Sequence, residues 1–146
     1  NSDMHEIISE SYRAPEYTNR PMTLVFAKER KHDSLKEAMF AGRSIAYFKD
    51  MIGGREEFVR PFFFSCISIG KMYYDNQKNR YFEITNNSDI PYYLVNGPKG
   101  APASVTIAAN AVTRVVLPKT FAGALQYDVK NVITGSESVL RIELKL

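Results

Sequence analysis

Apolar positions in the first sixty residues form two strand-like runs with a helical pattern between them. Met22–Ala27 is continuously apolar, which is typical of a strand buried on both faces. Apolar side chains then recur at helical spacing over residues 34–41, and residues 43–49 resume a strand that Gly53 and Gly54 end. If the two strands are parallel, this order predicts one βαβ unit with a right-handed crossover.

The predicted helix carries start and stop signals. Asp33 or Ser34 can act as the N-cap, and Ser34 with Glu37 completes a Ser-x-x-Glu capping box. Gly42 stands where a left-handed residue would end the helix. One helical face carries the apolar residues Leu35, Ala38 and Met39. We therefore expect a short amphipathic helix between the two strands.

Such a unit cannot be stable alone, because two strands and one short helix leave a sheet face and both strand edges uncovered. Residues 1–20 are polar and predict a loop, and the chain opens on Asn1 without an initiator Met or a signal-peptide pattern. We infer that residues 1–60 are the last part of a larger α/β domain. For the chain alone we expect a homo-oligomer that covers the exposed sheet, or partial disorder over residues 1–20.

The chain changes character near Pro61, after which every segment has the pattern of a strand. Turn residues separate these segments at intervals of roughly 8 to 12 residues. The predicted strands are Cys66–Tyr74, Arg80–Thr85, Ile90–Val95, Ala103–Ala108, Ala111–Leu117, Leu125–Ile133 and Ser138–Leu146. Residues 61–146 therefore predict an accessory antiparallel β-sandwich of immunoglobulin-like size, although the Cys and Trp pair of antibody domains is missing.

Composition and charge exclude several classes of protein. The single cysteine, Cys66, cannot form an internal disulfide or a four-ligand zinc site by itself. The longest apolar run, Phe58–Gly70, is interrupted and falls short of the roughly 20 residues of a membrane span. The formal net charge of +3 arises after residue 60, where lysines and arginines are spread singly. We expect neither a membrane span nor a nucleic-acid partner.

Three segments resemble the end of the PHP (polymerase and histidinol phosphatase) family of metal-dependent phosphoesterases. They are Ser-Asp-Met-His at 2–5, Arg-Pro-Met-Thr-Leu-Val-Phe-Ala at 20–27, and Ser-Leu-Lys-Glu-Ala-Met-Phe-Ala-Gly-Arg at 34–43. The chain looks most like the phosphodiesterase branch that carries an added C-terminal β domain. The resemblance implies a mixed fold, in which an incomplete α/β barrel remnant of one βαβ unit is followed by the immunoglobulin-like antiparallel β-sandwich.

The same resemblance implies the site residues and the cofactor. Asp3 and His5 match the last metal ligands of the family, whose complete members hold divalent manganese, zinc or iron and hydrolyse a phosphoester substrate. Arg20 is a candidate for binding a substrate phosphate through its guanidinium group, or it pairs with Glu16. The other ligands of the family precede position 1, so we expect the fragment alone to be inactive. From the sequence pattern alone, we would expect Asp3 and His5 to belong to a solvent-exposed loop at a chain end.

Other polar and aromatic residues admit structural interpretations. His32 lies beside the start of the predicted helix, and Arg43 enters a strand at the end of the unit opposite the loop after Ala27. Neighbouring predicted strands carry the aromatic residues Tyr73, Tyr74, Tyr81, Phe82, Tyr92 and Tyr93. Such a cluster forms a core and a packed interface to the barrel, or a stacking platform for sugars or bases. The competing function is therefore a non-catalytic module that binds a glycan or a protein. Whether a bacterial parent is cytoplasmic or exported stays open.

Overall fold

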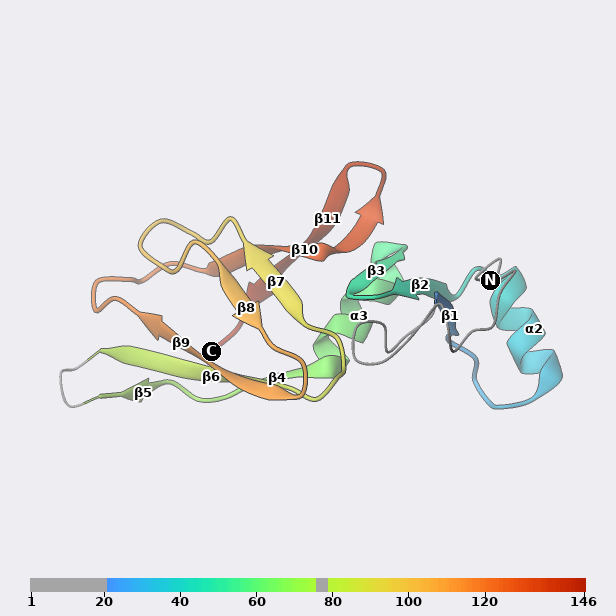
Figure 1. Cartoon of the computed structure of the whole chain (residues 1–146), viewed down its shortest axis with the longest axis horizontal. Coiled ribbons are helices and arrows are strands. Elements are labelled where there is room, and N and C mark those ends of the chain that lie inside the picture. The colour runs from blue at the N-terminus through green and yellow to red at the C-terminus, as the bar shows by residue number, and fades with distance from the viewer. Residues whose placement is uncertain (1–20, 76–78) are drawn as a thin grey trace, which may run out of the picture.

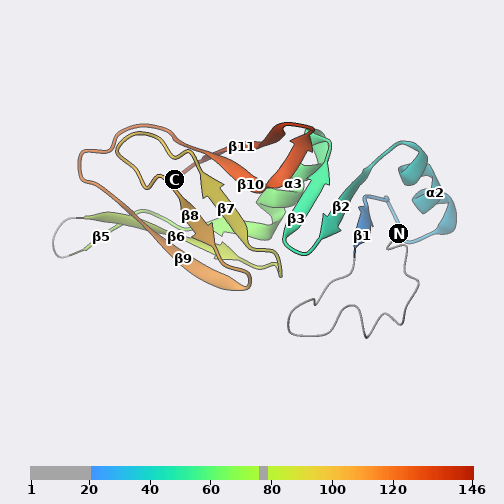
Figure 2. The same cartoon turned by 45° about the horizontal axis from the view of Figure 1, so that its top comes forward.

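The computed structural model describes residues 21–75 and 79–146, which form an elongated, mostly β molecule (Figure 1). A sandwich of two sheets makes up the larger part, and a smaller unit of strands and one helix extends from one end. The helix α2 (His32–Phe40) lies at the end of the molecule opposite β5 (Tyr73–Tyr74). Figure 2 shows the same separation from a second direction.

One layer is a seven-stranded sheet with the strand order β1-β2-β3-β10-β7-β8, in which β11 also pairs with β10. Its strands are β1 (Met22–Val25), β2 (Ser44–Phe48), β3 (Met51–Gly54), β7 (Tyr92–Val95), β8 (Val105–Ile107), β10 (Leu125–Gly135) and β11 (Ser138–Leu144). In the other layer β6 pairs with β4 and β5 along one side and with β9 along the other. Its strands are β4 (Ile67–Ile69), β5, β6 (Arg80–Asn86) and β9 (Ala111–Leu117).

Alternate residues of the facing strands point between the two layers and form the core. Fully buried members include Phe82, Ile84, Tyr92, Leu94, Ile107, Leu117, Tyr127, Val129, Leu140 and Ile142. This packing is the reason for the period-two pattern in the second half of the sequence. The strands predicted from residue 80 onward are confirmed, with small changes at their ends. The predicted strand over residues 66–74 is divided into β4 and β5.

The sequence analysis did not predict the helix α3 (Glu56–Cys66). We expected only strands after Pro61, and that interpretation is wrong for residues 61–66. The buried residues of this helix are Val59, Phe63 and Cys66, which follow one another at helical spacing. Pro61 lies inside the helix, where its missing N–H removes one backbone hydrogen bond. Burial of one apolar face outweighs that loss, so the helix continues through the proline.

The pairing of β1 with β2 also differs from the prediction, because the two strands are antiparallel. The helix between them ends close to the end of β1, as the hydrogen bond from the Phe26 N–H to the Arg43 carbonyl shows (N···O 2.9 Å). β2 therefore starts beside the end of β1 and can only run back along it. The expected parallel βαβ unit is wrong, and α2 is instead inserted between two strands of an antiparallel pair.

The two ends of α2 differ in how well the sequence predicted them. Lys31 is the N-cap and makes no side-chain capping bond. The predicted capping box does not form, because the Ser34 hydroxyl accepts a hydrogen bond from the Glu29 N–H (3.3 Å). At the other end Gly42 has a φ of +66° and follows the last turn as predicted. A left-handed backbone is a stronger constraint on residue type than a replaceable capping bond.

The strands before residue 60 and the sandwich share one sheet. β3 pairs antiparallel with β2 and parallel with β10, through Ile52 beside Val132 and Gly53 beside Ile133. The predicted division between residues 60 and 61 falls inside α3. Before α3 the described residues form the strands β1, β2 and β3 with the helix α2, and they form no closed barrel. The barrel remnant and its boundary therefore stay predictions.

Asn131 lies where two strands follow one another along the same edge of β10. β7 pairs with β10 at Asp128 and Val129, and β3 pairs at Val132 and Ile133. The Asn131 side chain is 5% exposed and occupies the gap between them. Its Nδ2 donates to the Asp50 carbonyl (2.5 Å) and the Pro91 carbonyl (2.7 Å). Its Oδ1 accepts from the Tyr93 N–H (3.2 Å). One amide thus joins β3, β7 and β10.

A second buried amide, Asn86, connects two turns near the same end of β7. Its side chain is 1% exposed, and Nδ2 donates to the carbonyls of Ile90 (2.8 Å) and Ala108 (3.1 Å). Oδ1 accepts from the N–H (3.0 Å) and the hydroxyl (2.7 Å) of Ser88. Asn86 therefore holds the turn before β7 against the turn between β8 and β9.

We predict that Asn131→Leu lowers the free energy of unfolding by about 2–4 kcal/mol, because two carbonyls and one N–H lose their partner in a buried place. Gln126→Ala is the matched control in the same strand, because its side chain bonds Glu143 at the surface. The control should cost less than about 0.5 kcal/mol. Urea unfolding of both variants measures the difference, and equal losses would contradict the bridging role of Asn131.

We also predict that Gly97→Ala destabilises the sandwich by about 1–3 kcal/mol. A Cβ atom at this position would lie 2.1 Å from the Pro102 carbonyl oxygen and 2.6 Å from a ring carbon of Tyr127. Gly53→Ala is the control, because nothing lies within 4 Å of a Cβ atom there. Thermal unfolding should show a clearly lower midpoint for Gly97→Ala only. A similar shift for both variants would show that loss of glycine itself, rather than close packing, causes the effect.

Candidate functional site

The predicted metal ligands and the predicted phosphate-binding arginine lie outside the described residues. Asp3, His5 and Arg20 all belong to residues 1–20. Within residues 21–75 and 79–146 no group of three His, Cys, Asp or Glu side chains could hold a metal ion. The assignments of Asp3, His5 and Arg20 therefore stay predictions.

The remaining histidine and the arginine after α2 have positions that indicate structural roles. His32 is the first residue of α2, and its Nδ1 lies 3.4 Å from Asp33 Oδ1 with both side chains exposed. Arg43 pairs through both terminal nitrogens with Glu37, and its Nε donates to the Phe26 carbonyl (3.3 Å). The hydrogen bond from Arg43 lowers the pKa of the Glu37 carboxyl. Arg43 thus connects α2 to the end of β1.

The six aromatic residues of the sequence cluster divide among three places. Phe82 and Tyr92 are buried, and the Tyr92 ring packs edge-on against Phe63 (centroids 4.8 Å apart). Tyr73 and Tyr81 stack on the outer face of the four-stranded sheet (5.6 Å), beside the exposed Tyr74. Tyr93 lies on the outer face of the other sheet. The cluster forms no single platform, but each outer face has an aromatic residue.

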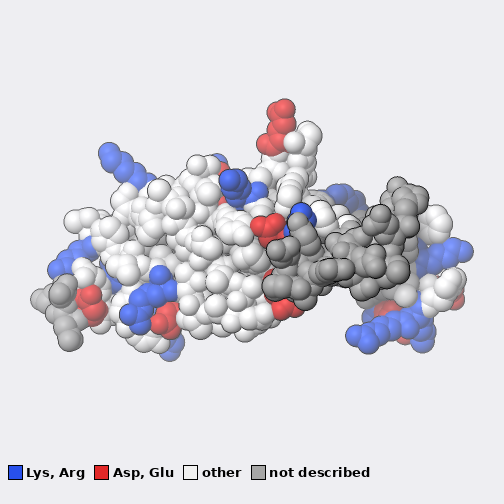
Figure 3. All heavy atoms as spheres, in the orientation of Figure 1, with Lys and Arg blue, Asp and Glu red and all other residues white. Residues whose placement is uncertain are grey.

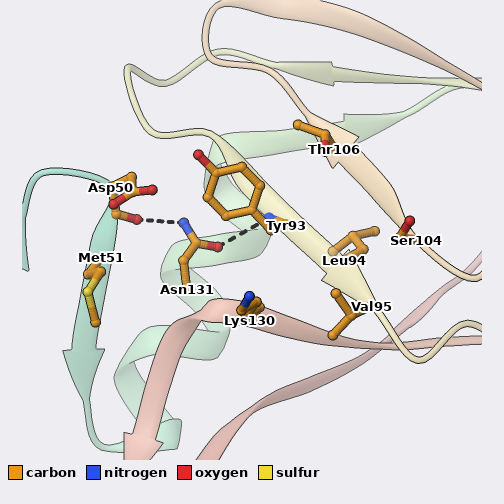
Figure 4. A pocket seen from close by; sticks show the side chains of 9 residues that line it. All are labelled: Asp50, Met51, Tyr93, Leu94, Val95, Ser104, Thr106, Lys130 and Asn131. Carbon is orange, nitrogen blue, oxygen red and sulfur yellow. Dashed lines mark hydrogen bonds between the residues drawn. The ribbon is translucent and has the colours of Figure 1, made fainter.

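Tyr93 stands in a surface hollow of about 520 Å³, which we call the Tyr93 notch. The notch is lined by Asp50, Met51, Tyr93, Leu94, Val95, Ser104, Thr106, Lys130 and Asn131 (Figure 4). Its floor is the outer face of β10, β7 and β8. Tyr93 is opposite Thr106 in the register, and Lys130 follows the paired residue Val129 on the other side. The turn between β2 and β3 forms one wall.

Charges and hydrogen bonds in the notch involve residues from three separate parts of the chain. Partial burial, together with a hydrogen bond to the Asp50 side chain, raises the pKa of the Tyr93 phenol. Asn131 holds the backbone carbonyl of Asp50 and the N–H of Tyr93 at the same time. Lys130 is exposed and brings a positive charge to the same hollow. Acid, base, phenol and hydroxyl groups therefore converge on one place.

The sequence analysis missed Asp50 and Lys130 as site residues. Neither belongs to a recognisable motif, and the two are far apart in the sequence. Their proximity arises from the pairing of β3 with β10, which no local pattern predicts. Tyr93 was noted for its ring, but the sequence could not show which of the paired residues Tyr92 and Tyr93 faces outward.

A second surface feature lies on α2, where apolar side chains are exposed. Ala38 is the only described residue of this helix that is buried. Met39 is 62% exposed and Phe40 is 84% exposed, and Leu35 is also exposed. A hollow of about 430 Å³ is lined by His32, Leu35, Lys36, Met39 and Phe40. We call this surface the α2 face.

Charged side chains are scattered over the surface that Figure 3 shows, and much of the sandwich there is uncharged. No basic stripe crosses this view, which agrees with the single spacing of lysines and arginines in the sequence. Among the described residues, the helices are too short and too polar to span a membrane.

One solved structure is similar over most of this chain. It is a crystal structure of a two-domain protein containing predicted PHP-like metal-dependent phosphoesterase, from Bacteroides vulgatus. The sequences are 29% identical, the TM-score is 0.77, and the similarity covers 88% of this chain and 39% of that chain. This chain therefore spans well under half the length of that protein. A search among curated proteins found no match.

A family model identifies the second half of the sequence. Residues 67–145 match the model of DUF5001, which is described as an Ig-like domain. These residues run from β4 to the end of β11 and so include both layers of the sandwich. The match confirms the immunoglobulin-like sandwich that strand lengths and turn spacing predicted. Because it covers more than half of the sequence, the chain belongs to the DUF5001 family of Ig-like domains.

Proposed function

We propose that this chain is the C-terminal part of a metal-dependent phosphoesterase and that its Ig-like domain is accessory to the catalytic domain. The observation that carries the proposal is the 29% identity to the two-domain protein described as containing a predicted PHP-like phosphoesterase. The Ig-like match begins at residue 67, whereas the similarity to that protein covers 88% of this chain. The likeness must therefore include much of the sequence before the Ig-like domain.

The α2 face supports the proposal that a catalytic domain packs against this chain. A helix of nine residues is too short to be stable on its own in water, so its stability must come from packing. Within this chain only Ala38 of the described helix is buried, while Met39 and Phe40 remain exposed. Exposed apolar residues that cluster on one short helix are typical of a surface that packs against another domain or protein. We assign that partner to the barrel of the parent phosphoesterase.

In the proposed parent, Asp3 and His5 would supply the last ligands of a metal cluster and Arg20 would bind a phosphate oxygen of the substrate. Carboxylate and imidazole groups suit zinc, manganese or iron, so this donor pair fits the implied metals chemically. A bound metal would supply electrophilic stabilisation of a phosphoryl group. Two ligands are fewer than such an ion needs, so the remaining ligands must come from the rest of the parent.

The proposed role of the Ig-like domain is to brace the end of the barrel. Arg55 connects the two parts, because its Nη2 donates to the carbonyls of Ala41 (2.9 Å) and Gly42 (2.8 Å) at the end of α2. The same guanidinium group lies over the Phe58 ring of α3 (4.8 Å). α3 then leads directly into the sandwich. Shared strands and this arginine would hold the sandwich in one orientation on the catalytic domain.

A non-catalytic binding module is the second candidate, and the Tyr93 notch is the observation that favours it. The notch is built by residues from both the strand unit and the sandwich. The two candidates are compatible, because an accessory domain of an enzyme can also bind a ligand.

We predict that Asp3→Ala combined with His5→Ala, made in the full-length parent, lowers manganese- or zinc-dependent phosphodiester hydrolysis on the order of 100-fold or more. The physical reason is the loss of ligands that hold the metal. Hydrolysis of bis(p-nitrophenyl) phosphate measures activity, and elemental analysis measures bound metal. His32→Ala combined with Asp33→Ala is the matched control, because this exposed His and Asp pair is not among the predicted ligands. Unchanged activity and metal content in the Asp3 and His5 variant would refute the ligand assignment.

A further prediction concerns the α2 face. Met39→Ser combined with Phe40→Ser should reduce self-association of the isolated chain, because these side chains are uncovered in it. In the full-length parent the same variant should lower the unfolding midpoint, because the barrel would lose apolar contacts. Val112→Ser combined with Val116→Ser is the control on the exposed face of β9. Light scattering and thermal unfolding measure the two effects. An isolated chain that is a monomer before substitution would contradict the expected self-association.

A further inference from the structure

The Tyr93 notch combines an aromatic ring with groups that donate and accept hydrogen bonds. Figure 4 shows Tyr93 between Asp50 of the β2–β3 turn and Thr106 of β8. Lys130 projects beside it from β10, and Ser104 adds a second hydroxyl. Met51, Leu94 and Val95 make the rest of the lining largely apolar. Polar groups that converge on a hollow with apolar side chains in its lining are the usual form of a small-molecule site.

The charges of the notch indicate the chemical class of the ligand. Asp50 and Lys130 have opposite signs, so their charges offset one another for any ligand that touches both. Asp128 lies outside the notch lining, two residue pairs along the sheet from Tyr93, and its carboxylate contacts Asn96 Nδ2 (2.8 Å) and Arg141 Nε (4.0 Å). Because Asp128 is paired with Arg141, the notch itself has one acidic and one basic side chain and no net positive charge that would favour a phosphate group. The balance favours a neutral ligand that offers both hydrogen-bond donors and acceptors.

The volume of the Tyr93 notch and its aromatic ring narrow the chemical class of the ligand further. A hollow of about 520 Å³ accepts a ligand of one or two sugar units. A pyranose has apolar C–H faces that pack against an aromatic ring, and hydroxyls around its edge that both donate and accept. Tyr93 provides such a ring, while Asp50, Lys130 and Thr106 surround it with an acceptor, a donor and a hydroxyl. We propose that the Tyr93 notch binds a neutral saccharide, with the sugar ring packed on Tyr93.

The site is preorganised, which reduces the loss of conformational freedom on binding. The Asp50 side chain lies beside Tyr93 in the wall of the notch. Asn131 fixes the backbone of both residues from below the notch. This proposal uses none of the predicted metal ligands, so it holds or fails independently of the proposed phosphoesterase function.

The test is a titration of the ¹⁵N-labelled chain of 146 residues, followed by amide chemical shifts. The probes are methyl glucoside, methyl galactoside, methyl mannoside, N-acetylglucosamine and cellobiose, with inorganic phosphate as the charged comparison. With at least one sugar we expect saturable shifts at residues 93, 106 and 130. Tyr93→Ala should weaken that binding at least about tenfold, because the ring is the central contact. Thr106→Val keeps the side-chain shape and should weaken it severalfold by removing one hydroxyl.

Tyr74→Ala is the matched control, because Tyr74 is an exposed tyrosine on the opposite sheet. It should leave sugar binding unchanged. Three results would overturn the proposal. They are an absence of shifts at the notch with every sugar, larger shifts at the notch with phosphate than with any sugar, and equal loss of binding in Tyr93→Ala and Tyr74→Ala. The amide spectrum of each variant also shows whether it is folded. If Tyr93→Ala does not fold, the loss of sugar binding in Thr106→Val tests the proposal in its place.

Discussion

The architecture depends on the buried amide of Asn131. Where β7 stops and β3 begins along one edge of β10, the ladder is interrupted and backbone groups lose their usual partners. An asparagine side chain offers two donor hydrogens and an acceptor oxygen within a small plane, which matches two carbonyls and one N–H. Aspartate would lack the donors and would place a charge beside carbonyl oxygens. Leucine would fill the space and satisfy none of the three groups.

The two functional proposals both use this junction. The strand unit, which carries the α2 face, joins the sandwich through the pairing of β3 with β10 beside Asn131. The same contact brings Asp50 next to Tyr93 and so creates a wall of the notch. An accessory domain that merely followed the catalytic part on a flexible linker would have neither property. The connection between the two parts is therefore also the place where a ligand-sized hollow arises.

Local patterns predicted the sandwich because each strand of residues 80–146 has one buried and one exposed face, and alternation reports that directly. They failed at α3, where Pro61 outweighed a helical spacing that Val59, Phe63 and Cys66 display. They also failed for the direction of β2, which depends on where α2 ends in space. The notch could not be predicted, because Asp50 and Lys130 meet only through a long-range pairing. The proposed ligands Asp3 and His5 rest on resemblance, since a short Asp-x-His segment has no structural signature of its own.

On the outer face of the four-stranded sheet, the Arg114 guanidinium group lies over the ring of Tyr81, and this position has a consequence for solubility. β9 is a seven-residue strand of mostly β-branched and apolar residues, and among the described strands it pairs only with β6. Such an edge can add a strand from another molecule and start aggregation. Arg114 is the one charged residue in β9; it lies 4.4 Å from the Tyr81 ring centre and pairs with Glu83. Arg114 places a charge at the middle of the strand, and this charge disfavours the pairing of β9 with a strand of another chain.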